Sequence, residues 1–497
     1  MKPLHLSKTQ IAVVDIGSNS VRMVIYNVSG RAFLPHYNER VMAGLGLGVA
    51  ETKRLSVTGK ENALRVLRRF SAILQGLSVE QVKAVATAAV RTAEDGPEFL
   101  ADAIAALSHP IEVLTGSDEA LLSAKGVAEG LHEAAGIVGD LGGSSLEFAT
   151  IENGQVASAE SHLLGPLAML RAGEGSTELR KRVRRKLEKS SLLSEQGRKL
   201  YIVGGAWRAL AKLHMGLTKY PLQQLHAYRM NASAISLIHE ATQSDDPVIR
   251  QRMAKASQKR LDVLPYAGII LSETFHIGGF EEVVVSSHGL REGVVFDALE
   301  HITNGRDALL DSICLYLDLN DSQQRFANEL FHWMLPVIRP PEDLFGERLI
   351  ETRILAAACM FADTGARFHP DHRADMAYDH ALRGPYANID HLERAFVALA
   401  TGTRYARNFE PRSALTELLD KQYVKLARQV GAVMRLGAVY SGRSADVLKT
   451  SKLEISQGAL VLRVHTQNAD MLSSDVERRL GNAADLFDLK SHITDWS

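Results

Sequence analysis

Two short segments of the sequence carry residues that could hold a phosphate group and a metal ion together. Asp15 is followed by Ile-Gly-Ser-Asn-Ser, and Asp140 is followed by Leu-Gly-Gly-Ser-Ser. Glycines let the backbone approach a bulky anion, and successive N–H groups of such a turn form an anion-binding concavity. A carboxylate beside the turn would repel phosphate unless it holds a hydrated Mg²⁺, which bridges carboxylate and phosphate oxygens. The segments therefore predict a Mg²⁺-assisted phosphate site, although a tight turn capped by its own Asp would have the same sequence.

The two segments belong to an internal repeat. Residues 13–24 align without a gap on residues 138–149, which lie 125 positions further along the chain. Each copy reads as an apolar strand, a turn rich in small polar residues and a second strand, which is typical of a β-hairpin. An Asp at the same place in both copies favours a shared chemical role over a merely structural turn.

Strand and helix patterns alternate after the first hairpin. Residues 56–76 have apolar side chains at helical spacing, and residues 82–87 read as a buried strand. The second copy leads to a strand at residues 200–203 that ends in Gly204 and Gly205. Hairpins followed by such alternation predict an α/β domain with a mixed sheet, here present twice.

Four further features are candidates for chemistry at a phosphate. Glu119 stands at the start of a predicted helix, where a carboxylate can activate water or merely complement the helix dipole. Arg91, at the end of the strand beginning at residue 82, has a fork that suits phosphate, with an ion pair to a carboxylate as the alternative. Arg22 faces either a cleft or solvent. Gly204 and Gly205 either contact phosphate or close a strand–helix turn.

The composition is that of an ordinary globular protein. Its 497 residues suggest roughly three or four domains. The 57 Lys and Arg residues balance 58 Asp and Glu residues, which argues against a nucleic-acid coat or a polybasic membrane binder. The cation-rich segment 180–186 is either a solvated helix face or an electrostatic entry for a polyanion.

The sequence shows no sign of export or membrane insertion. No apolar run reaches the ~18–20 residues of a membrane span, and no signal peptide is visible. The two cysteines, Cys314 and Cys359, support neither a disulfide framework nor a cysteine zinc site. We therefore expect a cytoplasmic protein without a membrane or nucleic-acid partner.

Seven motifs between about Ile11 and Leu299 occur in one order. They are Asp15–Ser20, Ala86–Arg91, Gly116–Ala120, Asp140–Glu147, Gly204–Arg208, Arg260–Pro265 and Ser286–Gly293. Together they resemble the motifs of the exopolyphosphatase / guanosine pentaphosphate phosphatase (Ppx/GppA) family of the actin–hexokinase-like superfamily. Each motif alone is weak, whereas all seven in this order are specific.

The resemblance implies an α/β fold with two duplicated ribonuclease-H-like domains flanking a cleft. We expect these domains at residues 1–126 and 127–303. A mostly α-helical region at 304–497 would follow, resembling a degenerate HD domain and ending in a small α+β cap with a hairpin at 453–464. Ala362 precedes Asp363 where a metal-binding HD pair would need His, so we predict no second metal centre.

The resemblance also implies roles for individual residues. Glu119 matches the base that activates water, Asp140 and Glu147 match the acidic groups associated with Mg²⁺ and catalysis, and Arg91 matches an arginine of the phosphate site. One departure is Ala88 or Ala89, where the family commonly has Asn. The predicted catalytic residues are Glu119, Glu147 and Asp140, and the predicted metal ligands are Asp15, Asp140 and Glu147. The predicted phosphate-binding residues are Gly17, Ser18, Asn19, Ser20, Arg22, Arg91, Gly142, Gly143, Ser144, Ser145, Gly204 and Gly205.

These expectations converge on an exopolyphosphatase that releases orthophosphate from the ends of inorganic polyphosphate with Mg²⁺ as cofactor. Hydrolysis of the 5′-phosphate of guanosine pentaphosphate by the same machinery is the close alternative. A sugar-kinase-like enzyme and a non-catalytic polyphosphate or nucleotide sensor are less favoured, since the Gly-Ser-Asp-Glu-Ala element and the acidic residues are retained. We expect a homodimer.

Overall fold

The computed structural model describes residues 9–170, 174–194, 198–299, 306–338, 350–411 and 414–496. The chain divides after Arg306 into two compact units. We call residues 8–306 the N-terminal unit and the residues from Asp307 onward the C-terminal unit. The boundary predicted between residues 303 and 304 lies outside the described residues. Within the described ranges, no helix combines the length and the apolar character that crossing a lipid bilayer requires.

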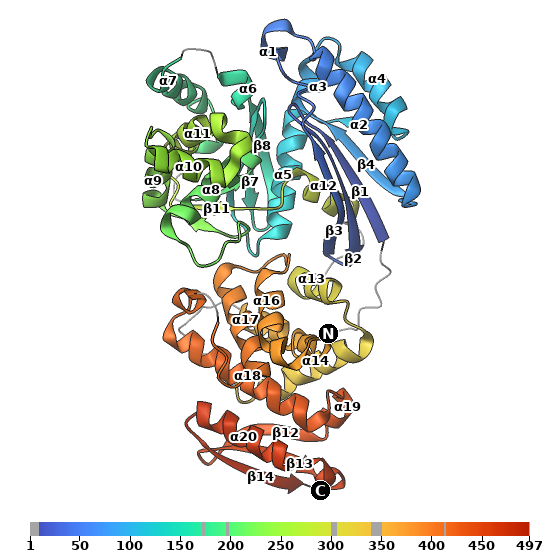
Figure 1. Cartoon of the computed structure of the whole chain (residues 1–497), viewed down its shortest axis with the longest axis vertical. Helices are drawn as coiled ribbons and strands as arrows, with labels where there is room; N and C mark the ends of the chain where they lie inside the picture. Colours follow the sequence, from blue (N-terminus) through green and yellow to red (C-terminus); the bar gives the residue numbers. More distant parts are fainter. Residues whose placement is uncertain are drawn as a thin grey trace. The chain divides into compact units, whose positions relative to one another are not determined.

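Two mixed sheets of related topology frame the N-terminal unit (Figure 1). Their strands are β1 (Thr9–Ile16), β2 (Val21–Ser29), β3 (Ala32–Val41), β4 (Gln81–Ala86), β5 (Glu112–Val113), β6 (Gly136–Leu141), β7 (Leu146–Glu152), β8 (Gln155–His162), β9 (Lys199–Val203), β10 (Arg229–Met230) and β11 (Glu282–Val285). The strand orders are β3-β2-β1-β4-β5 and β8-β7-β6-β9-β11-β10. In each sheet the first hairpin strand pairs antiparallel with the second and parallel with a later strand, β4 or β9. The repeat in the sequence is therefore a repeat in topology.

Helices cover the two sheets and bury their apolar faces. They are α1 (Val49–Thr52), α2 (Val57–Gly76), α3 (Ala88–Thr92), α4 (Gly96–Leu107), α5 (Gly116–Gly130), α6 (Pro166–Met169), α7 (Ser176–Leu187), α8 (Gly205–Thr218), α9 (Ala232–Thr242), α10 (Pro247–Ser257), α11 (Leu264–Ile277) and α12 (Leu290–Leu299), with 3₁₀ turns at Leu192–Ser194 and Gln258–Val263. Phe70 of α2 and Phe99 of α4 pack in the core of the first sheet. Trp207 of α8 is fully buried under the second sheet and donates to the carbonyl oxygen of Ala267.

Helices α5 and α12 join the two halves of the N-terminal unit. Gly293 of α12 lies so close to α5 that a Cβ there would be 1.8 Å from the carbonyl oxygen of Leu122. Val295 and Phe296 of α12 share a core with Val13 of β1. The predicted boundary between residues 126 and 127 falls inside α5, and the chain returns to the first sheet at α12.

The strand that we expected to continue to residue 87, with Arg91 at its end, is shorter than predicted. β4 ends at Ala86, and Ala88–Thr92 form the short helix α3. Alanine is the strongest helix former, and Thr92 donates to the carbonyl oxygen of Ala88 within this turn. The predicted helix at 56–76 is confirmed as α2, with the side chain of Ser56 capping its first turn.

The C-terminal unit combines a helical region with a small terminal sheet. Its elements are α13 (Ala308–Leu317), α14 (Asp321–Met334), α15 (Ile350–Met360), α16 (Arg373–Arg383), α17 (His391–Tyr405), α18 (Lys421–Ser441), α19 (Ala445–Leu448), β12 (Ser451–Ser456), β13 (Ala459–His465), α20 (Ser474–Leu486) and β14 (Lys490–Trp496), with 3₁₀ turns at Thr364–Arg367, Pro370–His372, Ala414–Leu418 and Thr466–Met471. The predicted hairpin is present, and both residues of its turn, Gln457 and Gly458, have positive φ, as a two-residue hairpin turn requires. Strand β14, which pairs parallel with β13, was not predicted.

The degenerate HD-like position is occupied by an ion pair. The carboxylate of Asp363 lies 2.8 Å from a guanidinium nitrogen of Arg443 and accepts a hydrogen bond from Gln323. Its oxygens are therefore engaged by neighbouring side chains.

Candidate phosphate site

The two Asp-bearing turns have the same local geometry. In the first, the N–H of Gly17 donates to the carbonyl oxygen of Ser20 at 3.0 Å. In the second, the N–H of Gly142 donates to the carbonyl oxygen of Ser145, also at 3.0 Å. We call these the first and second phosphate loops. Because each turn is closed by one short hydrogen bond between two paired strands, its backbone is fixed before any ligand binds.

The register of the hairpins places a second charged residue opposite each Asp. Asp15 of β1 pairs with Arg22 of β2, and Asp140 of β6 pairs with Glu147 of β7. The repeat thus carries a cation in one copy and an acid in the other at equivalent positions. This difference is the main chemical asymmetry between the two half-sites.

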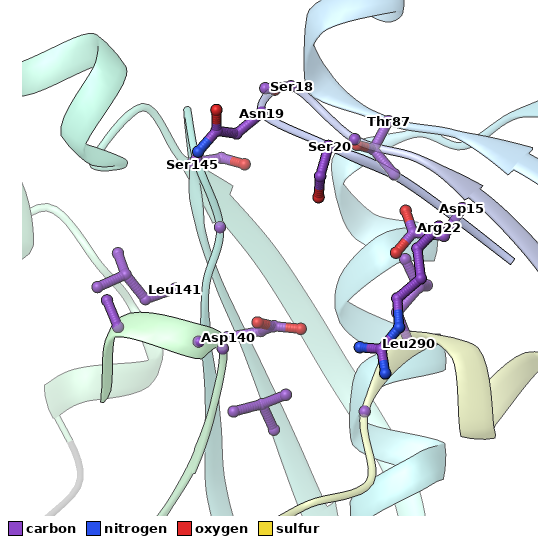
Figure 2. A pocket seen from close by; sticks show the side chains of 18 of the residues that line it. Asp15, Ser18, Asn19, Ser20, Arg22, Thr87, Asp140, Leu141, Ser145 and Leu290 are labelled. Atoms are coloured by element: carbon purple, nitrogen blue, oxygen red, sulfur yellow. The ribbon is translucent and has the colours of Figure 1, made fainter. Parts of the chain in front are cut away.

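Both loops line one pocket of the N-terminal unit, which has a volume of about 230 Å³. A Cβ built on Gly143 would lie 3.4 Å from the Cβ of Ser18, so the loops approach each other across the pocket. Figure 2 shows Asp15 and Ser20 on one side and Asp140 and Ser145 on the other. The predicted residues that line the pocket are Asp15, Gly17, Ser18, Asn19, Ser20, Arg22, Glu119, Asp140, Gly142, Gly143, Ser144, Ser145, Gly204 and Gly205.

Six cationic side chains also line this pocket. They are Arg22, Arg40, Arg208, Lys259, Arg260 and Arg291. Burial lowers the pKa of Arg40 to about 10, and the charges of Arg260, Arg22 and Arg291 add to the effect. Burial and the charge of Arg291 likewise lower the pKa of Arg208 to about 10. Guanidinium groups that depress one another's pKa create a local positive potential, which a polyanion would relieve. Four carboxylates of the lining offset part of it, namely Asp15, Glu119, Asp140 and Glu292.

Glu119 lies in the first turn of α5 and is paired with Arg91. Thr115 and Asp118 form a capping box that fixes this helix start. A guanidinium nitrogen of Arg91 lies 3.3 Å from the Glu119 carboxylate and 2.6 Å from the carbonyl oxygen of Leu114. Burial raises the pKa of Glu119 to about 7; Arg91 opposes the rise, whereas Asp140 and Asp15 add to it. A carboxyl group with this pKa is poised to accept a proton near neutral pH.

Asp15 and Asp140 have different partners. Asp15 is held by Arg291 of α12, with a guanidinium nitrogen 2.8 Å from its Oδ2. Oδ2 of Asp140 accepts a hydrogen bond from Ser123 of α5 at 2.6 Å. Burial raises the pKa of Asp140, and the hydrogen bond from Ser123 opposes the rise.

The donor set fits a Mg²⁺ that binds together with a phosphate. The described residues contain no group of three His, Cys, Asp or Glu side chains that could hold a metal ion by themselves. Mg²⁺ usually takes one or two carboxylates, keeps several waters and completes its shell with substrate phosphates. Asp15 and Asp140, which both line the pocket, are the carboxylates that could serve it in this way.

Glu147 lies beneath the second phosphate loop and is outside the pocket lining. It is 2% exposed, and Ser161 donates a hydrogen bond to its Oε1. Burial raises its pKa well above the usual range, and the charges of Glu119 and Asp140 raise it further. Burial and these neighbouring charges therefore favour the neutral form of Glu147 more than that of an exposed glutamate.

Gly204 and Gly205 form the third wall of the pocket. Gly204 has a φ of 95°, a conformation that favours glycine. A Cβ on Gly205 would lie 2.3 Å from a terminal guanidinium nitrogen of Arg260. The glycine pair thus closes a strand–helix turn and also makes room for a cation of the pocket.

Two further predicted features, besides Glu147, lie away from the pocket lining. Arg91 stands behind Glu119 as its ion-pair partner. Cations of α7, which carries the basic segment, form ion pairs with neighbouring carboxylates: Arg180 with Glu273 of α11, and Arg182 with Glu174. This pairing favours the interpretation of the basic segment as a solvated helix face.

Sequence reasoning missed most of the cations. Arg208, Arg260 and Arg291 each stand in one of the seven motifs, which is the signal that could have found them. Arg40 and Lys259 carry no such signal, because they come from a strand and a 3₁₀ turn that only the fold brings to the pocket.

Comparison with known proteins agrees with this geometry. Residues 24–302 match the Ppx/GppA phosphatase family, and residues 323–493 match the C-terminal region of exopolyphosphatases. The chain belongs to the Ppx/GppA phosphatase family. It is therefore a hydrolase of phosphoanhydride bonds.

Relatives and solved structures match between about three-fifths and nearly all of the chain. A guanosine-5′-triphosphate,3′-diphosphate pyrophosphatase of Aeromonas hydrophila is 26% identical over 94% of this chain and 96% of its own length. Retrograde regulation protein 2 of Saccharomyces cerevisiae is 23% identical over 81% of this chain and 74% of its own. The Ppx/GppA protein of Aquifex aeolicus superposes with a TM-score of 0.53 and 26% identity, covering 61% of this chain and all of that one. The predicted actin-like fold of two duplicated domains is confirmed.

Proposed function

We propose that this phosphatase is an exopolyphosphatase, which hydrolyses the terminal phosphoanhydride bond of inorganic polyphosphate and releases orthophosphate. The observation that carries the proposal is the pocket itself, where six cations and two phosphate loops surround Glu119. No aromatic side chain is among the described residues that line it, so a nucleobase would find no stacking platform there. A substrate recognised through its phosphates alone fits this lining best.

The loops and cations of the pocket bind and orient the phosphate chain. A phosphoanhydride already has a good leaving group, so positioning and charge neutralisation provide most of the rate. Loop backbones and the Ser and Asn side chains donate to phosphate oxygens, while Arg40 and Arg260 neutralise the chain. Binding relieves the mutual repulsion of these guanidinium groups, which contributes to affinity.

Glu119 activates the attacking water. Its carboxylate takes the proton of the water as the water oxygen attacks the terminal phosphorus, and the remaining polyphosphate leaves with the bridging oxygen. Arg91 orients this carboxylate and keeps part of it ionised near pH 7. Glu147 acts through Glu119 and Asp140 rather than on the substrate, since it does not line the pocket.

Asp15 and Asp140 would hold Mg²⁺ at the substrate. Bound there, the ion would neutralise charge on the phosphate oxygens. Arg291 and Ser123 fix the two carboxylates from behind, so that their orientation does not depend on the ligand.

Hydrolysis of guanosine pentaphosphate is the second candidate function. The Aeromonas hydrophila relative bears the name of an enzyme acting on that nucleotide and matches nearly the whole chain. The same loops and the same base would serve this reaction, with the nucleoside outside the pocket.

Phosphate release from the two substrates tests the proposal. Purified protein with Mg²⁺ is given polyphosphate or guanosine pentaphosphate at equal concentrations of terminal phosphoanhydride, with an Asp140→Asn preparation as the blank for contaminating phosphatases. We expect kcat/KM for polyphosphate to be at least about tenfold higher, a difference of ~1.4 kcal/mol. A preference of that size for the nucleotide would overturn the proposal in favour of the second candidate.

A further inference from the structure

A cluster of cations in the C-terminal unit has no role in the site described above. Helices α17, α18 and α20 belong to this unit (Figure 1), and residues of all three line a small cavity of about 20 Å³. It is lined by Thr403, Arg407, Ala432, Arg435, Arg479, Asn482 and Leu486. We call the polar members of this set, Thr403, Arg407, Arg435, Arg479 and Asn482, the C-terminal arginine cluster.

The positive charge of the cluster is only partly balanced. Arg407 pairs with Asp485 and donates to Asn482. Among the described residues, Arg435 and Arg479 have no carboxylate within ion-pair distance, and the nearby Asp475 is paired with Arg478. The pKa of Arg435 is lowered to about 10. Burial is the largest cause, and repulsion from the charges of Arg479, Arg404 and Arg478 lowers it further. Such repulsion costs stability unless an anion offsets it.

Polar atoms at the cavity lack the partners that burial demands. The hydroxyl group of Thr403 is buried, its residue is 1% exposed, and its Oγ1 has no hydrogen-bond partner. Nε of Arg479 is also buried without a partner. Buried polar groups are normally satisfied, so each of these needs an explanation.

Helix dipoles do not provide that explanation. Arginines in the last turn of a helix can stabilise its negative end. This applies to the end of α17, which is near Arg407, but Arg435 and Arg479 stand in the middle of α18 and α20. Their convergence is therefore a feature of the tertiary fold rather than of individual helices.

We propose that the C-terminal arginine cluster binds a phosphate-class oxyanion. A tetrahedral oxyanion accepts several charge-assisted hydrogen bonds at once. Three guanidinium groups, one hydroxyl group and one amide group could donate them, from α17, α18, α20 and the segment that follows α17. The cavity is only large enough for about one water-sized group, so the anion would lie at its mouth, and a nucleoside would remain outside. The anion is orthophosphate or the terminal phosphoryl group of a longer phosphate compound. This site lies in the other unit from the phosphate loops and does not depend on which substrate the enzyme prefers.

Hydrogen exchange of the full-length protein measures binding locally and separately from the catalytic pocket. Exchange of peptides from α17, α18 and α20 is followed by mass spectrometry against increasing sodium phosphate, with sodium chloride keeping the ionic strength constant and EDTA preventing turnover. We expect phosphate to slow exchange in these three helices. A second series with tripolyphosphate identifies the source of the anion. If orthophosphate and tripolyphosphate protect the helices at equal half-maximal concentrations, the ligand is orthophosphate. If tripolyphosphate protects them at a lower half-maximal concentration, the ligand is the end of a phosphate chain.

Matched variants decide between a site and a general salt effect. Arg435→Met should raise the half-maximal phosphate concentration at α17, α18 and α20 by at least about tenfold, as loss of a charge-assisted hydrogen bond would. Arg428→Met is the control, because Arg428 stands on the same helix but pairs with Glu410 outside the cavity. Thr403→Val, which keeps shape and charge, should also weaken binding and serves if Arg435→Met fails to fold. Protection that is absent, equally produced by chloride, or equally lost in the control would overturn the proposal.

Discussion

At the scale of single residues, the proposed chemistry depends on one carboxyl group whose pKa is raised to about 7. Glu119 is buried beside Asp140 and Asp15, and Arg91 is the cation that opposes the rise. A base acts only when ionised, so the sign of each pH effect follows from these neighbours.

The acidic limb of the pH profile should report Glu119. Because the pKa of Glu119 is about 7, kcat/KM of the native enzyme should fall as the pH decreases through that value. Arg91→Met removes the cation that lowers this pKa, so its acidic limb should move to higher pH. The measurement is kcat/KM against pH, with Arg185→Met as a control outside the pocket. An unchanged limb in Arg91→Met would remove Arg91 from this role.

The raised pKa also has a consequence for stability. The protonated form is favoured in the folded state, so the contribution of Glu119 to stability is fully present below its unfolded pKa of about 4.5 and is lost as the pH rises through about 7. Glu119→Gln has no ionisable group at this position, so its stability does not fall in this way as the pH rises. Tm is measured for both proteins without divalent metal. The Tm of the variant minus that of the native protein should therefore increase between about pH 5 and 8. This increase corresponds to at most about 3 kcal/mol in the free energy of unfolding. A constant difference across that range would contradict the raised pKa.

At the scale of elements, the pocket depends on close approaches that only glycine allows. Gly205 begins α8 and has the guanidinium group of Arg260 against it. The sequence revealed the pair Gly204 and Gly205, as it revealed both phosphate loops. In each case the strand and the turn that follows it are neighbours in the sequence, so residue type and spacing are enough to find them. The contact between Gly205 and Arg260 was not predicted, because Arg260 reaches the pocket from a 3₁₀ turn more than fifty residues later. Only the place of Arg260 in one of the seven motifs signalled a role for it.

Gly205→Ala should displace Arg260 and weaken substrate binding while the fold survives, because the atom displaced is the end of a flexible side chain. We expect KM for polyphosphate to rise about tenfold, the loss of one charge-assisted contact. Gly216→Ala in the same helix is the control, since a Cβ there meets no atom within 4 Å. The control should keep its KM and gain up to about 1 kcal/mol of stability from the better helix former. Equal KM values in both variants would contradict the packing argument.

The same contrast between local and non-local information holds for the other elements. The hairpin of β12 and β13 was predicted because its turn and alternation are local. β14 was missed because it gains its partner, β13, through a parallel pairing across α20. From the sequence alone, we assigned the residues of α3 to the end of a strand. Five residues are too few for their apolar periodicity to distinguish a helix from a strand.

At the scale of the whole molecule, overall neutrality conceals a local excess of cations. The chain has a net charge of −1, yet six cations and four carboxylates line one pocket. Acidic residues elsewhere in the chain balance this excess. The total charge argues against a nucleic-acid coat or a polybasic membrane binder, but it does not reveal this local field.

The attraction between pocket and substrate should be sensitive to salt. Raising the salt concentration from about 0.05 to 0.5 M shortens the screening length several-fold, so kcat/KM for polyphosphate should fall by at least about tenfold. Arg260→Gln should show a shallower dependence than the native enzyme. Arg185→Gln, which removes an exposed charge of α7, should keep the native slope. Parallel slopes for all three proteins would show that the pocket cations do not attract the substrate.

The account as a whole depends on Glu119 acting on a phosphate chain that the two loops hold. The most direct test measures phosphate release and polyphosphate binding on one preparation of Glu119→Gln, which keeps the size of the side chain and removes the base. We predict that turnover falls by about 10²–10⁴-fold, as loss of a general base does, while the Kd for polyphosphate stays within about threefold of the native value. Turnover at the native rate would contradict the central claim.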